Sequence, residues 1–96
     1  MYDLAVKNVA QAHQAGIKIL VGTDVFDTYV FPGSSVHDEL AELVDAGLSP
    51  SAAIRAATIS AAIFSGKEHE LGSISAGKVA DMVLLDANPL QDIRST

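Results

Sequence analysis

The chain has 96 residues, a formal net charge of −6 and a mean hydropathy of +0.30, with 49% apolar and 19% charged residues. This composition predicts one small folded domain and excludes disorder throughout, which requires low hydrophobicity and high charge. The six lysines and arginines are scattered singly, cysteine is absent, and no apolar run approaches the roughly 20 residues of a membrane span. Nucleic acid and membranes are therefore not expected partners, disulfides and thiolate metal sites are excluded, and the cytoplasm is the default location.

The first third of the chain predicts a helix followed by a buried strand. Polar residues recur at helical spacing between Tyr2 and Gln14, and Gly16 is a typical stop just beyond them. The β-branched run at residues 17–21 is typical of a buried strand, so the pair forms half of an α/β unit. A loop of about a dozen residues follows, and long ordered loops in α/β proteins tend to carry function.

Three more helices are expected in the middle of the chain. Ser35, with Asp38 three residues later, predicts the capped start of an amphipathic helix. Its polar face is expected to be solvated and consists of Asp38, Glu39, Glu42 and Asp45. Ser49 and Pro50 predict the cap and the first residue of an Ala-rich helix that extends to residue 58. Ser60 predicts the cap of a last short helix that ends before Gly66.

Beyond Gly66, strand-like runs replace the helical spacing. Residues 71–74 and 82–85 predict two short strands, separated by a turn at residues 75–78. Asn88 and Pro89 predict another turn, and residues 92–96 have the pattern of a further strand that is just beginning. A small β region is therefore expected after the helices.

Asp24 and His37 are the two residues whose positions suggest chemistry. Asp24 follows the predicted strand at its carboxyl end, where α/β proteins place catalytic groups. Position alone leaves both that role and an Asx turn or loop cap open. His37 begins the helix after the long loop, where a boundary histidine bonded to the backbone and a ligand or substrate contact are both open. The helix dipole favours a neutral ring at that position.

The other histidines do not form a metal site by themselves. His13 is expected in the core or at its boundary, and His69, between two glutamates, is expected to be solvated. The chain contains no His-x-His, no His-Glu-x-x-His and no Gly-x-Ser-x-Gly. One carboxylate and one imidazole are too few for a self-contained metal or triad site.

Several short motifs nevertheless occur in a recognisable order over nearly all of the chain. They are Gly22-Thr23-Asp24, Val36-His37-Asp38-Glu39-Leu40, Ala46-Gly47-Leu48-Ser49-Pro50, Ala56-Ala57-Thr58, Leu71-Gly72-Ser73-Ile74 and Ala76-Gly77-Lys78-Val79-Ala80-Asp81. Together they resemble the C-terminal portion of amidohydrolase superfamily enzymes, most closely the imidazolonepropionase-like and prolidase-like metal-dependent hydrolases. The resemblance implies one or two divalent metals, usually zinc, that activate water to hydrolyse amide, cyclic amide or dipeptide C–N bonds of small molecules.

The resemblance also implies a fold and roles for the two candidate residues. The expected fold class is α/β: residues 1–66 are the last helix-strand-helix unit of a TIM barrel that this chain leaves incomplete, and residues 67–96 are strands of a small composite β-sandwich. Because Gly-Thr-Asp matches the last barrel strand, Asp24 is implied to be a metal ligand and to accept a proton from the attacking water. The match of His37 implies a residue that lines the substrate pocket.

The family's other metal-site residues have no counterpart here. These are a His-x-His on the first barrel strand, a bridging Lys or Glu and two later histidines, and one ligand is too few for a catalytic metal. The sequence therefore predicts a fragment of a zinc-dependent amidohydrolase that is metal-free and inactive alone. Its unpaired strand edges predict self-association or domain swapping. The alternative is a short noncatalytic module, derived from the same family, with an oligomeric interaction or structural role.

Overall fold

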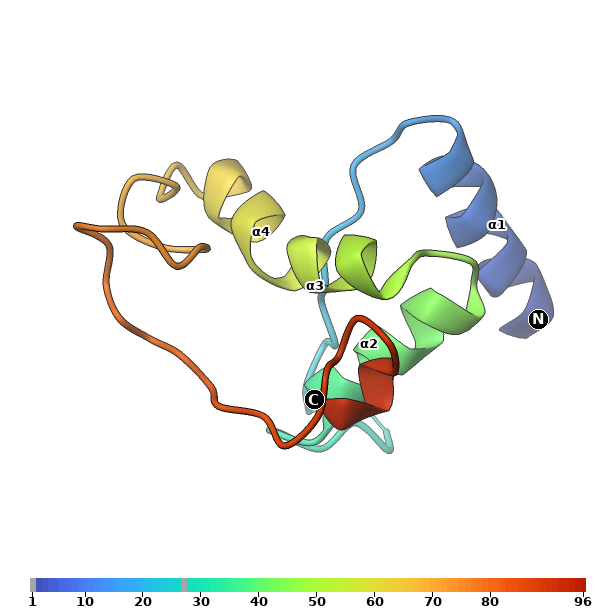
Figure 1. The fold of residues 1–96 in the computed structure, drawn as a ribbon. Helices are drawn as coiled ribbons and strands as arrows, with labels where there is room; N and C mark the ends of the chain where they lie inside the picture. The colour runs from blue at the N-terminus through green and yellow to red at the C-terminus, as the bar shows by residue number, and fades with distance from the viewer. Residues whose placement is uncertain (1, 27) are drawn as a thin grey trace.

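The computed structural model describes residues 2–26 and 28–96, and its regular structure is helical. In chain order the elements are α1 (Tyr2–Gln14), α2 (Ser35–Asp45), α3 (Pro50–Ala57), α4 (Ile59–Phe64) and the 3-10 helix η1 (Ile93–Ser95). Figure 1 shows α1, α2 and α3 grouped together, while the chain after α4 swings out in a wide arc and returns to α2 at its end. Within the described residues, no helix has the length and apolar character needed to cross a membrane.

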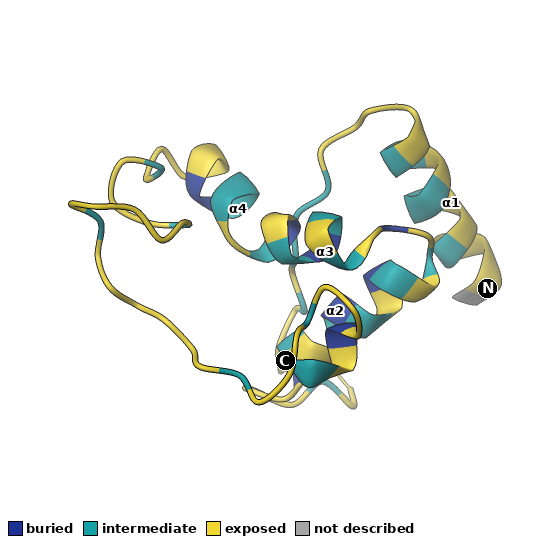
Figure 2. Ribbon diagram, viewed as in Figure 1, coloured by how far each residue is buried: buried dark blue, intermediate teal, exposed yellow. Residues whose placement is uncertain are grey.

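A small core lies where α2, α3 and the C-terminal end of the chain meet. Its buried residues are Leu40, Leu43, Leu48, Ala53, Ala56 and Ile93. The two leucines of α2 share one helix face and the two buried alanines of α3 share another, because each pair is three residues apart, and Leu48 lies between the helices (Figure 2). Ile93 in η1 is 4% exposed, so the last turn of the chain closes this core over α2.

The predicted helices are confirmed, most closely where their signals are local. α1 has the predicted bounds, and Gly16 follows it with a φ of +82°. The Ser49 hydroxyl accepts a hydrogen bond from the Ala52 amide at 3.1 Å, and Pro50 is the first helical residue of α3, both as predicted. Gly66 follows the end of α4 with a φ of +69°.

Two predicted helix caps are wrong. Ser35 lies inside α2 and is buried, whereas the N-cap is Ser34, whose side chain makes no capping bond. The Ser35 amide donates instead to the Phe31 carbonyl at 3.1 Å, which extends the turn before the helix. Thr58, not Ser60, precedes α4, and its hydroxyl donates to the Ile54 carbonyl at 2.7 Å. The unusual Thr58 backbone, with φ −125° and ψ −96°, separates α3 from α4.

The predicted strands do not form within the described residues, so the secondary structure there does not confirm the predicted α/β class. Residues 17–21, 71–74 and 82–85 lie in the described part of the chain and none forms a strand. A strand obtains its backbone hydrogen bonds from a neighbouring strand, and these segments exchange no backbone hydrogen bonds with one another. Residues 93–95 form η1, because the Asp92 carboxylate accepts a bond from the Arg94 amide and caps a helical turn.

Both predicted turns in this C-terminal region are confirmed. The Lys78 amide donates to the Ser75 carbonyl at 3.2 Å, which closes the turn at residues 75–78. The Asn88 side-chain oxygen accepts a bond from the Leu90 amide at 2.9 Å, in the manner of an Asx turn. Local side chain to backbone bonds thus form without any strand on either side.

Candidate functional site

Asp24 lies in the loop before α2, with its side chain exposed. Its backbone has a φ of +53°, and Phe26 and Tyr29 in the same loop have φ values of +80° and +63°. A non-glycine residue in this region is strained by roughly 1–2 kcal/mol, less for aspartate than for aromatic residues. Clustered strain of this kind is typical of loops whose conformation serves a site.

The start of this loop is tied to two helices by consecutive backbone amides. The Val21 amide donates to the Ala56 carbonyl at 3.2 Å, and the Gly22 amide donates to Glu39 Oε1 at 3.4 Å. The Ala56 carbonyl can accept this bond because it lies in the last turn of α3, where carbonyls lack an intrahelical partner. α3 therefore holds the backbone at Val21, and α2 holds the backbone at Gly22, shortly before Asp24.

His37 is exposed in the first turn of α2, and its partner is the last residue of the chain. Its Nδ1 lies 3.2 Å from Thr96 Oγ1, and that hydroxyl donates its hydrogen to the Ile93 carbonyl at 3.0 Å. Since a hydroxyl has one hydrogen, both contacts are hydrogen bonds when Nδ1 donates to Oγ1, and in that tautomer of the neutral ring Nε2 is an acceptor. Among the described residues no hydrogen bond or ion pair joins His37 to Asp24.

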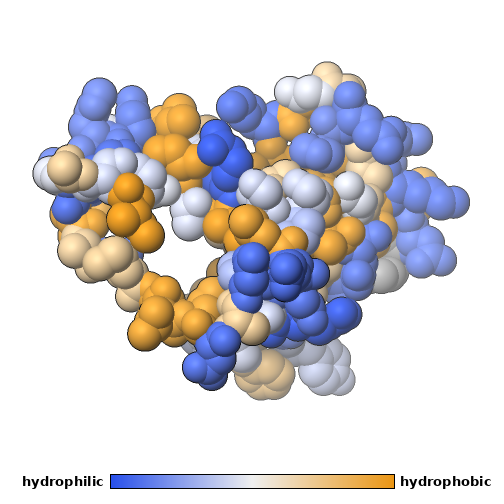
Figure 3. Space-filling model, in the orientation of Figure 1, coloured by the Kyte–Doolittle hydropathy of each residue, from blue (hydrophilic) through white to orange (hydrophobic). Residues whose placement is uncertain are grey.

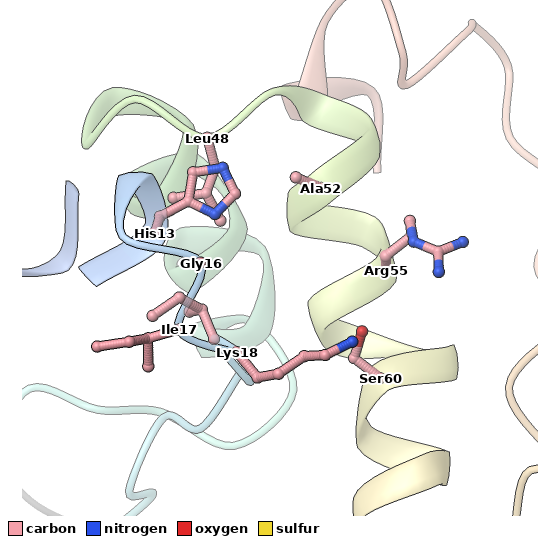
Figure 4. A pocket seen from close by; sticks show the side chains of 9 residues that line it. His13, Gly16, Ile17, Lys18, Leu48, Ala52, Arg55 and Ser60 are labelled. Carbon is pink, nitrogen blue, oxygen red and sulfur yellow. The ribbon is translucent and has the colours of Figure 1, made fainter. Parts of the chain in front are cut away.

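Two grooves lie away from both candidate residues. The first has a volume of about 270 Å³ and is lined by His13, Gly16, Ile17, Lys18, Ile19, Leu48, Ala52, Arg55 and Ser60. The second, of about 310 Å³, is lined by Lys18, Leu20, Ser60, Ile63 and Phe64. In Figure 4 the Lys18 ammonium lies beside the Ser60 hydroxyl, while the Arg55 guanidinium points away from His13. The sequence did not indicate these grooves, since packing brings α1, α3 and α4 to residues 17–19.

The remaining polar predictions are confirmed, except that Glu39 is not fully solvated. His13 is half-buried at the edge of the first groove, as expected of a boundary residue. The His69 side chain is 90% exposed, and its Nε2 lies 3.8 Å from Glu68 Oε1. On the acidic face of α2, Asp38, Glu42 and Asp45 are exposed and Glu39 is half-buried.

The residues described do not fit a complete metal site. Across residues 2–26 and 28–96, no group of three or more His, Cys, Asp or Glu could hold a metal ion. Catalytic zinc sites use three protein ligands, and the exposed Asp24 carboxylate belongs to no such group within the described residues.

Comparison with known proteins decides the family. The Amidohydrolase family matches this chain over residues 5–96. The chain belongs to the amidohydrolase family. This amidohydrolase chain is 36% identical over 94 residues to ochratoxinase of Aspergillus niger, which covers 96% of the chain and 18% of that protein. It is 42% identical over 79 residues to imidazolonepropionase of Rubrobacter xylanophilus, which covers 77% of the chain and 18% of that protein.

A solved structure gives the same result. The crystal structure of a provisionally assigned prolidase from Bifidobacterium longum superposes with a TM-score of 0.86 at 45% identity, covering 94% of this chain and 22% of that one. The predicted resemblance to imidazolonepropionase-like and prolidase-like amidohydrolases is thereby confirmed. Amidohydrolases are generally metal-dependent. The chain spans about a fifth of the length of these relatives.

Proposed function

We propose that this amidohydrolase chain is the C-terminal part of a metal-dependent hydrolase that cleaves amide, cyclic amide or dipeptide C–N bonds of small molecules. The observation that carries the proposal is the family match over residues 5–96. Relatives named imidazolonepropionase and prolidase support the class of reaction. In the complete enzyme, residues 1–66 would be the last unit of a TIM barrel and residues 67–96 part of a β-sandwich. The cytoplasm remains the predicted location.

Asp24 is the residue proposed to carry chemistry, as a ligand of the metal, most simply zinc, and as a catalytic carboxylate. Three observations support this role: its place three residues after Val21, its left-handed backbone, and the two bonds that fix the amides of Val21 and Gly22. His37 is proposed to border the substrate pocket, since it lies at the start of the helix that follows the same loop and has Nε2 free of partners in the described chain. Because the chain supplies one such ligand, we propose that it is inactive alone.

The test transplants the chain into a complete enzyme. Residues 5–96 replace the matching part of the Bifidobacterium longum prolidase, to which the chain is 45% identical. We expect the chimera to bind zinc and hydrolyse a dipeptide, and Asp24→Asn to lower kcat/KM by at least about 100-fold. Asp45→Asn, an exposed carboxylate on the outer face of α2, is the matched control and should keep full activity.

Two outcomes would overturn these proposals. An Asp24→Asn chimera with full activity and stoichiometric zinc would remove Asp24 from the site. Zinc binding or dipeptide hydrolysis by the isolated 96-residue chain would show that the chain is not inactive alone. Zinc content measured beside activity separates a lost ligand from a lost catalytic group.

The second candidate function is a noncatalytic interaction or structural module derived from the same family, acting as an oligomer. The observation that favours it is the lack of a three-ligand group among the described residues, combined with apolar side chains left exposed between residues 79 and 84. A chimera that folds, as judged by circular dichroism, yet binds no zinc and hydrolyses nothing would favour this function over the first.

A further inference from the structure

Glu39 differs from the other acidic residues on the outer face of α2. Asp38, Glu42 and Asp45 are exposed, whereas Glu39 is half-buried. Figure 3 shows hydrophilic side chains over most of the side of the molecule where Figure 1 draws α1 and α2, as expected where helix faces are solvated. A carboxylate that loses part of its hydration is stable only when a hydrogen-bond donor replaces the lost water. The burial of Glu39 therefore directs attention to its partner.

The partner of Glu39 is a backbone amide rather than a cation. The Gly22 amide donates to Glu39 Oε1 at 3.4 Å, and across residues 2–26 and 28–96 Glu39 makes no ion pair. The bond closes the loop that carries Asp24 onto the second turn of the helix that follows it. At 3.4 Å it is at the long end of the range for hydrogen bonds, so it adds little to the stability of the whole fold. Its effect is expected to be local to the loop.

Glu39 is the part of this anchorage that a substitution can remove. The second bond at the start of the loop, from the Val21 amide to the Ala56 carbonyl at 3.2 Å, joins two backbone groups and persists when side chains are changed. Asp24 lies two residues beyond Gly22, and successive Cα atoms are about 3.8 Å apart, so the two Cα atoms lie within about 7.6 Å of each other. A displacement at the Gly22 amide therefore reaches Asp24 through a very short stretch of chain.

The backbone at Asp24 depends on such anchorage because it is strained. Its φ of +53° lies in the left-handed region, which is unfavourable for a residue with a side chain. Strained conformations persist only where the surrounding structure holds them in place. The bond to Glu39 supplies part of this restraint on the side of the loop that precedes Asp24. Without it, the backbone could relax and turn the Asp24 carboxylate away from its place.

We propose that Glu39 is a positioning residue for Asp24. The inference rests on the proposed function, in which Asp24 is a catalytic carboxylate. Glu39 acts through the backbone: it accepts the bond from the Gly22 amide and thereby fixes the direction of the Asp24 side chain. A displacement of about 1 Å in a catalytic group can lower the rate about 100-fold. Loss of the bond should therefore lower kcat and leave KM nearly unchanged.

The test uses the chimera with the Bifidobacterium longum prolidase, on which 94% of this chain superposes. Glu39→Ala removes the acceptor, and we expect kcat per folded molecule to fall by about 10–100-fold with KM within about twofold. Circular dichroism gives the folded fraction. Glu39→Gln keeps an acceptor oxygen and should retain activity within about threefold of the unaltered chimera. Glu42→Ala truncates an exposed glutamate on the same helix and is the matched control that should keep full activity.

A double-mutant cycle determines whether Glu39 acts through Asp24. In an Asp24→Asn chimera the carboxylate is already absent, so adding Glu39→Ala should lower kcat by less than about twofold more. A purely structural role would make the two losses multiply. Hydrogen exchange measures the bond itself: the Gly22 amide should exchange at least about tenfold faster in Glu39→Ala and near its original rate in Glu39→Gln.

The outcomes separate this inference from the proposed function. Full kcat in Glu39→Ala, an equal loss in Glu39→Gln, or losses that multiply in the double variant would overturn the role of Glu39 and leave Asp24 catalytic. Unchanged exchange of the Gly22 amide in Glu39→Ala would overturn the bond. An Asp24→Asn chimera with full activity, or a folded chimera with none, would overturn the proposed function and the positioning role with it.

Discussion

Gly72 packs against the start of α4 in a place with no room for a side chain. Its φ is +94°, and a Cβ added there would lie 2.8 Å from the Ala62 Cβ and 2.9 Å from the Ile59 Cα. Both distances are far inside the roughly 3.5–4.0 Å of a normal carbon contact. We expect Gly72→Ala to lower the free energy of unfolding by about 1–2 kcal/mol through the backbone, and by about 1–3 kcal/mol more through overlap with the helix.

Gly77 provides a matched control within the same region. Its φ is +87°, but a Cβ added there would meet no atom within 4 Å. Gly77→Ala should therefore lose only the backbone contribution, about 1–2 kcal/mol. Urea denaturation followed by circular dichroism measures both variants, and the difference between them isolates the contact with α4. Equal losses in the two variants would refute the packing of residue 72 on this helix.

Two further predictions use the same denaturation assay. Ser49→Ala removes the acceptor of the Ala52 amide and should cost about 1 kcal/mol, whereas Ser51→Ala, at an exposed position in the same turn, should stay within about 0.5 kcal/mol. Leu43→Ala opens a cavity in the small core and should cost about 2–5 kcal/mol, whereas Leu4→Ala, at a residue 62% exposed, should change stability by about 0.5 kcal/mol or less. Similar losses within either pair would contradict the burial or the cap assigned to it.

The helices could be predicted because their hydrogen bonds join residues close in the sequence. Ser49, Pro50 and Gly66 act within one turn of the backbone they cap or end, so their patterns were sufficient. The start of α2 depends on more than its own turn. Ser34 and Ser35 are equivalent as residue types, and a bond from the loop, Ser35 amide to Phe31 carbonyl, decides which of them enters the helix.

The candidate site could be predicted only as far as the motifs reach. Position and resemblance indicate Asp24 and His37, and their roles remain predictions. The partner of His37 is Thr96, which is 59 residues away, and only tertiary packing could reveal it. The grooves were missed for the same reason, although Lys18 inside an otherwise apolar run was a signal that one side of residues 17–21 faces outward.

Residues 17–21 pack against the helices without the hydrogen-bond ladder of a strand. Ile19 and Val21 pack against the core of α2 and α3, whereas Lys18 and Leu20 line the second groove with Phe64. The helices that cover Ile19 and Val21 lie within the chain, so these side chains are partly buried without a sheet, whereas Ile17 is 59% exposed. The backbone bonds of a strand would need another strand on each side.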